Sequence, residues 1–404
     1  MKILSALVLS SFLMSCNGQN QNNTSISTTE SSTERVGGEC EEGYCELIYF
    51  GMPEKMNSTD TSPGWHEKGQ KLIVTGTAFQ IDGKTPAPNV IIYYHHTDND
   101  GYYSKRNDKP ENQTRHGHIR GWVKTDANGK YTIKTNRPAP YPDGSEPAHI
   151  HWLIKEPNVK NEYWTDELYF DDDKLLLPYI KKKKKPLENR GGSGIARILL
   201  RDSLQIVEHD FVLGLNIPNY PKKTNDTKQS GLHIGEDQPS FIPFHAFGPD
   251  KGTQTCAVCK YGRYHGIVYF VGNNTSWTEI KKWLQFLEQE SDKRKKYLKV
   301  YFVYGNDKNY NKNERQKQLE NLGNELNLKN TALTFVPSFS DKKTEANLNK
   351  INPNVENTFI IYKHRSIVDK YIDLKPTDEN FKLLSNVLDN TQGEYFDLSE
   401  PEYD

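Results

Sequence analysis

Three side chains that can bind a metal ion, Tyr141, His149 and His151, lie within eleven residues of one another. In an extended strand successive side chains alternate between the two faces, so His149 and His151 point the same way while Ile150 points the other way. Two imidazoles then converge on one point. Because histidine pairs also occur as ordinary polar residues, the surrounding sequence has to decide between the two interpretations.

Short β-type segments surround this pair from Lys71 to about Leu215. Branched and aromatic residues recur in them, and turns such as Asp126 to Gly129 separate them at short intervals. This pattern predicts an all-β sandwich. The lysine run from Lys181 to Lys185 is expected to be a solvated loop, with contact to lipid headgroups as the alternative. The expected strands cover residues 72–81, 90–96, 120–125, 130–135, 164–170, 194–201 and 204–213.

An ordered set of motifs in this region resembles the intradiol ring-cleavage dioxygenases, the catechol and protocatechuate dioxygenase family. The resemblance covers about residues 72–215, and the order of its motifs is more specific than any one of them. It implies a β-sandwich that holds non-haem ferric iron, Fe(3+), by two tyrosines and two histidines. Carried over residue by residue, the ligands are Tyr103, Tyr141, His149 and His151. The motifs in chain order are Gly101-Tyr102-Tyr103, Thr125-Asp126 to Tyr131, Pro138 to Pro142, Pro147 to His151, and Leu168 to Asp173.

The chemistry of these residue types favours the same ligand set. Phenolate oxygens are hard anionic donors that suit Fe(III), and a bound trivalent ion lowers the pKa of a phenol. Tyr102 is a rival to Tyr103 as the first ligand. The resemblance also implies the reaction: a catechol-type ortho-diol chelates the iron, O2 reacts with it, and the ring opens to a muconate-type diacid. Tyr141, released on binding, acts as the base.

Two acidic residues depart from the family pattern. The family generally has an arginine before the histidine motif and a glutamine before the Tyr-Phe pair, where this chain has Glu146 and Glu167. Both changes add negative charge near a site for an anionic substrate, so we expect a compensating cation, and Arg120 is the candidate. Its alternative is a surface arginine. The remaining nearby histidines are expected to lie behind the ligands, in contact with them, or at the surface: His95, His96, His116 and His118.

The N-terminal segment reads as a secretion signal. Lys2 precedes an apolar stretch from Ile3 to Met14, which is too short to span a bilayer, and Ser15-Cys16 follows it. The pattern resembles the lipobox of bacterial lipoproteins, in which the cysteine becomes lipid-modified; an ordinary signal peptide is the alternative. Residues 1–15 are therefore expected to be cleaved and 16–45 to form a lipidated, disordered tether. The expected location is the periplasmic or cell-surface side of a membrane.

Four cysteines remain if Cys16 carries lipid: Cys40, Cys45, Cys256 and Cys259. An even number in an oxidising compartment suggests disulfides, with local pairing expected. A four-thiolate zinc site is the alternative. Cys256-Ala-Val-Cys259 also has the spacing of a thiol redox motif, so a structural disulfide and an active redox pair both stay open.

After the sandwich, expected at residues 46–217, and a linker at 218–239, the composition changes. Strands and helices alternate from 240 to 392, and an acidic tail covers 393–404. The alternation followed by a hairpin and a helix resembles the thioredoxin fold. Two features depart from it: the cysteine pair precedes the first strand, and Asn357 stands where thioredoxins have a cis-proline. Strands are expected at 266–272, 298–304, 332–336, 358–362 and 367–372, and helices at 276–289, 313–326 and 377–388.

The function expected from the sequence is therefore that of a membrane-anchored intradiol dioxygenase with an α/β second domain. Two alternatives stay open: a catalytically silent module that binds iron or an aromatic ligand, and a thiol-disulfide oxidoreductase that uses Cys256 and Cys259. A formal net charge of -1 over 404 residues gives no global field for nucleic acid. The expected partners are a catechol-type substrate, O2 and a lipid membrane, and assembly into a homo-oligomer stays open.

Overall fold

The computed structural model describes residues 35–40, 45–105, 115–183, 187–221, 229–308, 310–393 and 395–401. The predicted signal peptide, Cys16 and the tether up to residue 34 lie outside these ranges, as do parts of the lysine run, of the linker and of the acidic tail. Residues from Arg35 onward cluster into one compact unit. Among the described helices, none is both long enough and apolar enough to cross a membrane.

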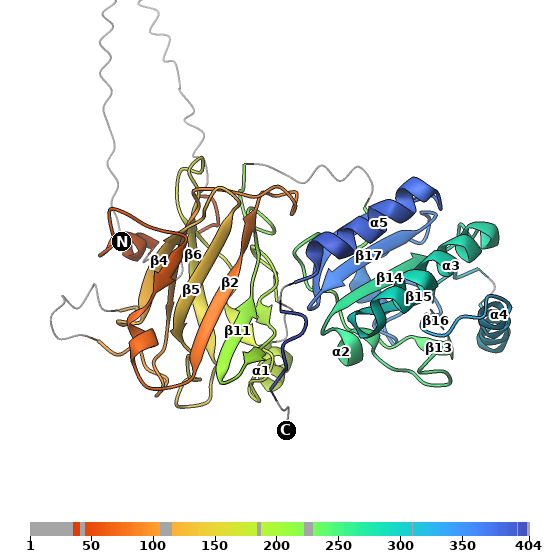
Figure 1. Ribbon diagram of the computed structural model, residues 1–404, viewed down its shortest axis with the longest axis horizontal. Coiled ribbons are helices and arrows are strands. Elements are labelled where there is room, and N and C mark those ends of the chain that lie inside the picture. Colours follow the sequence, from red (N-terminus) through yellow and green to blue (C-terminus); the bar gives the residue numbers. More distant parts are fainter. Residues whose placement is uncertain are drawn as a thin grey trace, which may run out of the picture. The chain divides into compact units, whose positions relative to one another are not determined.

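Two sheets form the N-terminal β-sandwich (Figure 1). The first sheet has the order β1-β5-β2-β11-β10, with β12 also paired to β2. The second has the order β4-β3-β6-β8-β9, with β7 also paired to β6. The strands of the first sheet are β1 (Thr59–Thr61), β5 (Lys130–Asn136), β2 (Lys71–Phe79), β11 (Leu204–Glu208), β10 (Leu199–Arg201) and β12 (Phe211–Val212). Those of the second are β4 (Arg120–Lys124), β3 (Ile91–His96), β6 (His149–Lys155), β8 (Leu168–Phe170), β9 (Ile195–Ala196) and β7 (Tyr163–Trp164).

Alternation along the strands separates the core from the outer face of the second sheet. Ile92 and Tyr94 of β3 and Ile150 and Trp152 of β6 pack into the core between the sheets. Residues one position away point outward, because successive side chains of a strand alternate. The outer face therefore carries the odd-numbered residues of β3 and β6, which include Tyr93, His95, His149, His151 and Leu153.

The predicted sandwich strands are present, but those at residues 164–170, 194–201 and 204–213 are each divided into two short strands, and β1 is additional. The lysine run does not form a loop along its described length. Helix α1 (Leu176–Lys183) begins where the Asp173 carboxylate accepts a hydrogen bond of 2.9 Å from the Leu175 amide. The three lysines of α1 lie in its last turn. Positive charge at that end is favourable because it interacts with the helix dipole.

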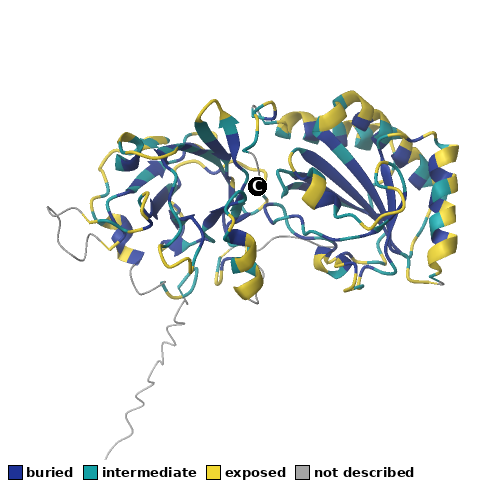
Figure 2. Cartoon of the chain, turned by 90° about the horizontal axis from the view of Figure 1, so that it is seen from below, coloured by how far each residue is buried: buried dark blue, intermediate teal, exposed yellow. Residues whose placement is uncertain are grey.

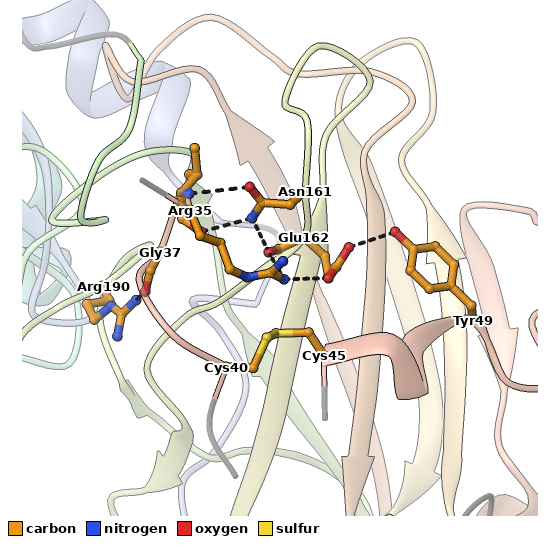
Figure 3. Close-up of a disulfide and its surroundings, with 9 residues drawn as sticks. Arg35, Gly37, Cys40, Cys45, Tyr49, Asn161, Glu162 and Arg190 are labelled. Carbon is orange, nitrogen blue, oxygen red and sulfur yellow. Dashed lines mark hydrogen bonds and ion pairs between the residues drawn. A yellow bond between two sulfur atoms is a disulfide. The ribbon is translucent and has the colours of Figure 1, made fainter. Parts of the chain in front are cut away.

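The segment before the sandwich is better anchored than the predicted tether (Figure 3). Arg35 forms an ion pair with Glu162, and the Gly37 amide donates to the carbonyl of Pro218 at 2.8 Å. The short helix η2 (Cys45–Tyr49) follows, and Tyr49 donates to Glu162 at 2.7 Å. Within the described ranges, contact with the sandwich thus begins at Arg35, ten residues before the predicted end of the tether.

The C-terminal module is a mixed sheet of six strands in the order β13-β16-β15-β14-β17-β18. Strands β14, β15 and β16 run parallel, whereas β17 and β18 are antiparallel to their neighbours. Helices α3, α4 and α5 bury their apolar residues against one face and expose their other sides (Figure 2). The elements are β13 (Phe244–Phe247), α2 (Ala257–Tyr261), β14 (His265–Val271), α3 (Trp277–Arg294), β15 (Leu298–Tyr304), α4 (Lys312–Glu325), β16 (Ala332–Phe335), β17 (Thr358–Lys363), β18 (Ser366–Ile372) and α5 (Asp378–Thr391).

Every strand and helix predicted in this module is present, and β13 and α2 are additional. The unit β14-α3-β15 and the hairpin β17-β18 followed by α5 have the order expected of a thioredoxin-like fold. Helix α4, however, leads to a further parallel strand, β16, before the chain returns to β17. The predicted linker is also shorter, because the Gly231 and Gly235 amides already donate to the carbonyls of Lys350 and Ile367. The thioredoxin-like identity stays a prediction.

Candidate metal centre

The four predicted iron ligands come together beside the outer face of the second sheet. The hydroxyl oxygens of Tyr103 and Tyr141 are 3.2 Å apart. Nε2 of His151 lies 3.0 Å from the Tyr103 oxygen and 3.0 Å from Nε2 of His149. The ring of Tyr141 meets the ring of His149 edge-on at 5.3 Å. Two oxygens and two nitrogens from different parts of the chain thus gather in one place.

The sheet positions the histidines, and two loops bring in the tyrosines. His149 and His151 lie on β6, where Nδ1 of His149 is 2.7 Å from the carbonyl oxygen of Pro147. Tyr103 follows β3, and Tyr141 precedes β6. The two loops approach closely at Gly101, which has a φ of +83°. A Cβ at that position would lie 2.2 Å from the carbonyl oxygen of Pro140, so only glycine allows this approach.

The arrangement of the donor atoms suits binding to a metal ion better than direct contact between the atoms. A carbonyl oxygen only accepts, so Nδ1 of His149 carries the proton and Nε2 presents a lone pair. Nδ1 of His151 faces a carboxylate oxygen of Glu167 at 3.9 Å, which favours the same tautomer. Two lone pairs that face each other at 3.0 Å repel unless a proton or a cation lies between them. Imidazole nitrogens and phenolate oxygens suit ferric iron, so the residues present fit that ion.

In the absence of a cation, burial keeps the Tyr103 phenol protonated. It raises the pKa of Tyr103 well above its ordinary value, and Tyr141, Glu146 and Glu167 raise it further. The Tyr103 phenol is therefore neutral unless a strong positive charge is close to its oxygen. A bound trivalent ion provides such a charge.

A layer of aromatic rings supports the ligands from the side of β3 and β4. The His95 ring stacks on His151 at 4.7 Å and on His116 at 3.8 Å. Nδ1 of His116 lies 2.9 Å from the hydroxyl of Tyr93, which is fully buried beneath Ile48 of η2. His95 and His116 thus lie next to the predicted ligand set.

The other two histidines of the predicted outer group lie elsewhere. Nε2 of His96 is 2.8 Å from the Thr135 hydroxyl of the first sheet. Nε2 of His118 is 2.6 Å from a carboxylate oxygen of Glu67. Neither ring is oriented toward the iron ligands by these contacts.

An acidic and aromatic cluster lies on the opposite side of the histidine ligands, and sequence reasoning found only its two carboxylates. The Tyr169 hydroxyl lies 3.3 Å from Glu146 and 3.4 Å from Glu167. Tyr179 of α1 donates to Glu146 and lies 3.2 Å from the Tyr169 hydroxyl. The Lys183 ammonium lies 4.5 Å from the centre of the Tyr179 ring. The strand register could have identified Tyr169, because it pairs directly with His149. Lys183 could be identified only with the knowledge that the lysine run is helical.

Arg120 is not the cation that lies beside these glutamates. It pairs with His95 across β4 and β3, and β6 then separates it from β8 and the acidic cluster. Its guanidinium lies 5.8 Å from the Trp122 ring, and within the described ranges its buried Nη1 atom has no hydrogen-bond partner. Strand order explains the difference, because β3 and β6 lie between β4, which carries Arg120, and β8.

The four cysteines form two local disulfides, Cys40–Cys45 and Cys256–Cys259. In the described part of the chain, the one group of His, Cys, Asp and Glu side chains close enough to share an ion is Cys40, Cys45 and Glu162. Its two sulfurs are bonded to each other, so it offers no thiolate pair. Because all four cysteines are paired in disulfides, they do not form the four-thiolate zinc site considered above.

The Cys256–Cys259 disulfide does not occupy the position of a thioredoxin redox centre. Cys256 caps α2, whose Val258 packs with Phe270 on the face of the sheet opposite α3. The loop between β14 and α3 holds Asn273 to Ser276 instead of cysteines. The cysteine pair thus precedes β14, the strand predicted at residues 266–272, although the additional strand β13 comes before the pair.

Comparisons with known proteins match the part of the chain that contains this candidate site. Residues 50–189, about a third of the chain, match the family model described as a dioxygenase. Strands β9 to β12 lie beyond this match.

Among curated proteins, a catechol 1,2-dioxygenase of Acinetobacter baylyi is 32% identical over 124 residues, which cover 27% of this chain and 39% of that protein. A chlorocatechol 1,2-dioxygenase of a Pseudomonas species is 33% identical over 164 residues, which cover 35% of this chain and 58% of that protein. The chain thus spans about 40 to 60% of the length of these two curated relatives.

Similarities to solved structures lie at low identity. The wild-type catechol 1,2-dioxygenase of Acinetobacter radioresistens has a TM-score of 0.32 at 15% identity, covering 48% of this chain and 66% of that one. A dioxygenase domain from a Streptomyces species has a TM-score of 0.29 at 22% identity, covering 40% of this chain and 91% of that one.

Proposed function

We propose that the sandwich is an Fe(III)-dependent intradiol dioxygenase, which inserts both atoms of O2 into a catechol-type ortho-diol and opens the ring between the two hydroxylated carbons. The observation that carries this proposal is the meeting of two phenol oxygens and two imidazole nitrogens at 3.0 to 3.2 Å. The sequence similarity to catechol and chlorocatechol 1,2-dioxygenases supports it.

The residues of the site have distinct roles in this proposal. When bound, ferric iron would supply a Lewis acid that orients the diol and favours its reaction with O2. His149 and His151 are held on a strand, so their Nε2 atoms keep fixed positions. Tyr141 lies on a loop and is half-buried, which allows its oxygen to move and accept a proton from a diol hydroxyl. The His95 ring stacks on the His151 ring and covers one of its faces.

The test separates turnover from silent binding. Iron-loaded protein is titrated with catechol without oxygen, and we expect the visible absorption to change as the diol binds. Isotopically labelled O2 is then admitted, and mass spectrometry should find both labelled atoms in a muconate-type diacid. A colour change without oxygen consumption would identify a silent binding module, and no colour at all would reject the iron site.

We also propose that lipid on Cys16 anchors the protein to a membrane. The support is the sequence pattern alone, because Cys16 lies outside the described residues. The change Cys16→Ser should move the protein from the membrane fraction to the soluble fraction, and the unchanged chain expressed in parallel is the control. Retention of the variant in the membrane after a high-salt wash would contradict the proposal.

A further inference from the structure

The acidic cluster is close enough to the donor atoms to interact with a bound substrate. Glu167 approaches Nδ1 of His151 at 3.9 Å, and the Tyr169 hydroxyl lies between Glu167 and Glu146. The His149 and Tyr169 rings are 5.6 Å apart. The two carboxylates also contribute to the raised pKa of Tyr103, so their charge is felt at the donor atoms themselves.

Among the described residues, the charges printed for this cluster do not cancel. Two carboxylates are accompanied there by one ammonium, that of Lys183, which lies 4.5 Å from the Tyr179 ring centre and 6.0 Å from that of Tyr169. Burial opposes the charge on Lys183, but the hydrogen bond to Tyr179 and the two glutamates raise its pKa. The Lys183 side chain is exposed at the end of α1, so it can move away when another cation enters.

Because the His149 and Tyr169 rings are 5.6 Å apart, a diol held at the donor atoms with its substituents on the Tyr169 side would bring them close to these groups. A positively charged substituent would be attracted to the excess negative charge, whereas a carboxylate would be repelled. Partial shielding from water strengthens both effects relative to bulk solvent. The negative charge that is unfavourable for a plain catecholate therefore becomes favourable for a diol that carries its own cation.

We propose that Glu146 and Glu167 make the site selective for catechols with a cationic side chain, such as a primary ammonium group, over catechols with a carboxylate side chain. This inference rests on the proposed dioxygenase function and adds the substrate class. Lys183 acts as the counter-ion that the substrate ammonium displaces.

The test compares three catechols of similar size and different charge: dopamine, 4-ethylcatechol and 3,4-dihydroxyphenylacetate. Dissociation constants come from anaerobic titration of the visible absorption, and kcat/KM comes from oxygen uptake. We expect preferences of about tenfold for dopamine over 4-ethylcatechol and about tenfold for 4-ethylcatechol over the acid. High salt should reduce both ratios, because it screens partly exposed charges.

The variants Glu146→Gln, Glu167→Gln and their double combination keep the shape of the cluster and remove its charge. The double variant should bind the three catechols with nearly equal affinity, while Lys183→Gln should increase the preference for dopamine. Asp143→Asn is the matched control, because Asp143 lies on the same loop as Glu146 but is exposed and accepts from the Ser145 amide. Iron content and colour without substrate show that each variant retains its site.

The outcomes distinguish a failure of this inference from a failure of the proposed dioxygenase function. If 4-ethylcatechol is cleaved, and the wild type and the double variant prefer the three catechols in the same order, the proposed role of the two glutamates is overturned. The proposed dioxygenase function is not overturned in that case. Preference for the acid over dopamine also overturns the proposed role of the two glutamates. Iron-loaded protein that binds none of the three catechols overturns the proposed function, and the substrate class with it.

Discussion

At the scale of single residues, His149 and His151 depend on different partners. His149 is oriented by the Pro147 carbonyl, whereas His151 is oriented by stacking on His95 and by the charge of Glu167. Backbone partners persist through most side-chain substitutions. We therefore expect the position of His149 to tolerate changes in its neighbours better than that of His151.

Removal of either histidine ligand should abolish the iron centre. His149→Ala or His151→Ala takes away one of four protein ligands, and we expect iron content to fall by about tenfold or more, together with the visible absorption. Metal analysis and an absorption spectrum measure this. His66→Ala, an exposed histidine in the same domain, is the control. Full iron occupancy in both ligand variants would reject the assignment.

His95 should affect the spectrum of the centre without binding the metal. His95→Leu removes the ring that stacks on His151 while keeping the site apolar, so the His151 ring gains freedom to rotate. We expect iron to remain bound but the absorption band to shift or broaden, and kcat to fall more than KM rises. Identical spectra for the variant and the wild type would show that the stacking does not position His151.

At the scale of elements, the positions of strands were more predictable than their neighbours in the sheets. The alternation in residues 90–96 and around His149 to His151 was enough to place two strands and to separate their inward and outward faces. It could not give the order β4-β3-β6-β8, because that order depends on contacts distant in sequence. The sequence therefore could not show that Arg120 lies across β3 and β6 from the acidic cluster, and it did not single out Lys183.

Helix η2 supports the candidate metal site indirectly through the buried Tyr93. Ile48 is fully buried against this group of side chains, so Ile48→Ala should lower the free energy of unfolding by about 2–4 kcal/mol. Urea denaturation followed by fluorescence would measure the loss. Glu46→Ala changes an exposed residue of the same element and should have little effect. Equal stability of the two variants would show that η2 does not cover the sheet in solution.

At the scale of the whole molecule, buried histidines predict a loss of stability in acid. Burial lowers the pKa of His209 to about 3, and its ring stacks on Trp152 at 5.5 Å. An unfolded chain has a histidine pKa near 6.5, so below that value the unfolded state binds the proton that the folded state excludes. Stability is therefore retained above about pH 6.5 and declines as the pH falls toward 3, by up to about 1.4 kcal/mol per pH unit for each such group.

His209→Phe tests this dependence, because phenylalanine fills a similar space beside Trp152 and Phe211 and does not titrate. Denaturation series at pH 7 and pH 5 should show a smaller difference for the variant than for the wild type. An unchanged difference would assign the acid sensitivity to other groups. The sequence could not predict this behaviour, since only the packing shows that His209 lacks a hydrogen-bond partner for Nε2 among the described residues.

The two disulfides join cysteines that are five and three positions apart. A crossed pairing, such as Cys45 with Cys256, would instead close a loop of roughly two hundred residues, at an additional entropic cost of about 3 kcal/mol. Native bonds can therefore form in the unfolded chain before any of the three sheets assembles, and correct pairing needs no guidance from the fold. A fully reduced chain should recover both bonds during air oxidation without an isomerase, and even partly folded or truncated forms should carry the correct pairs.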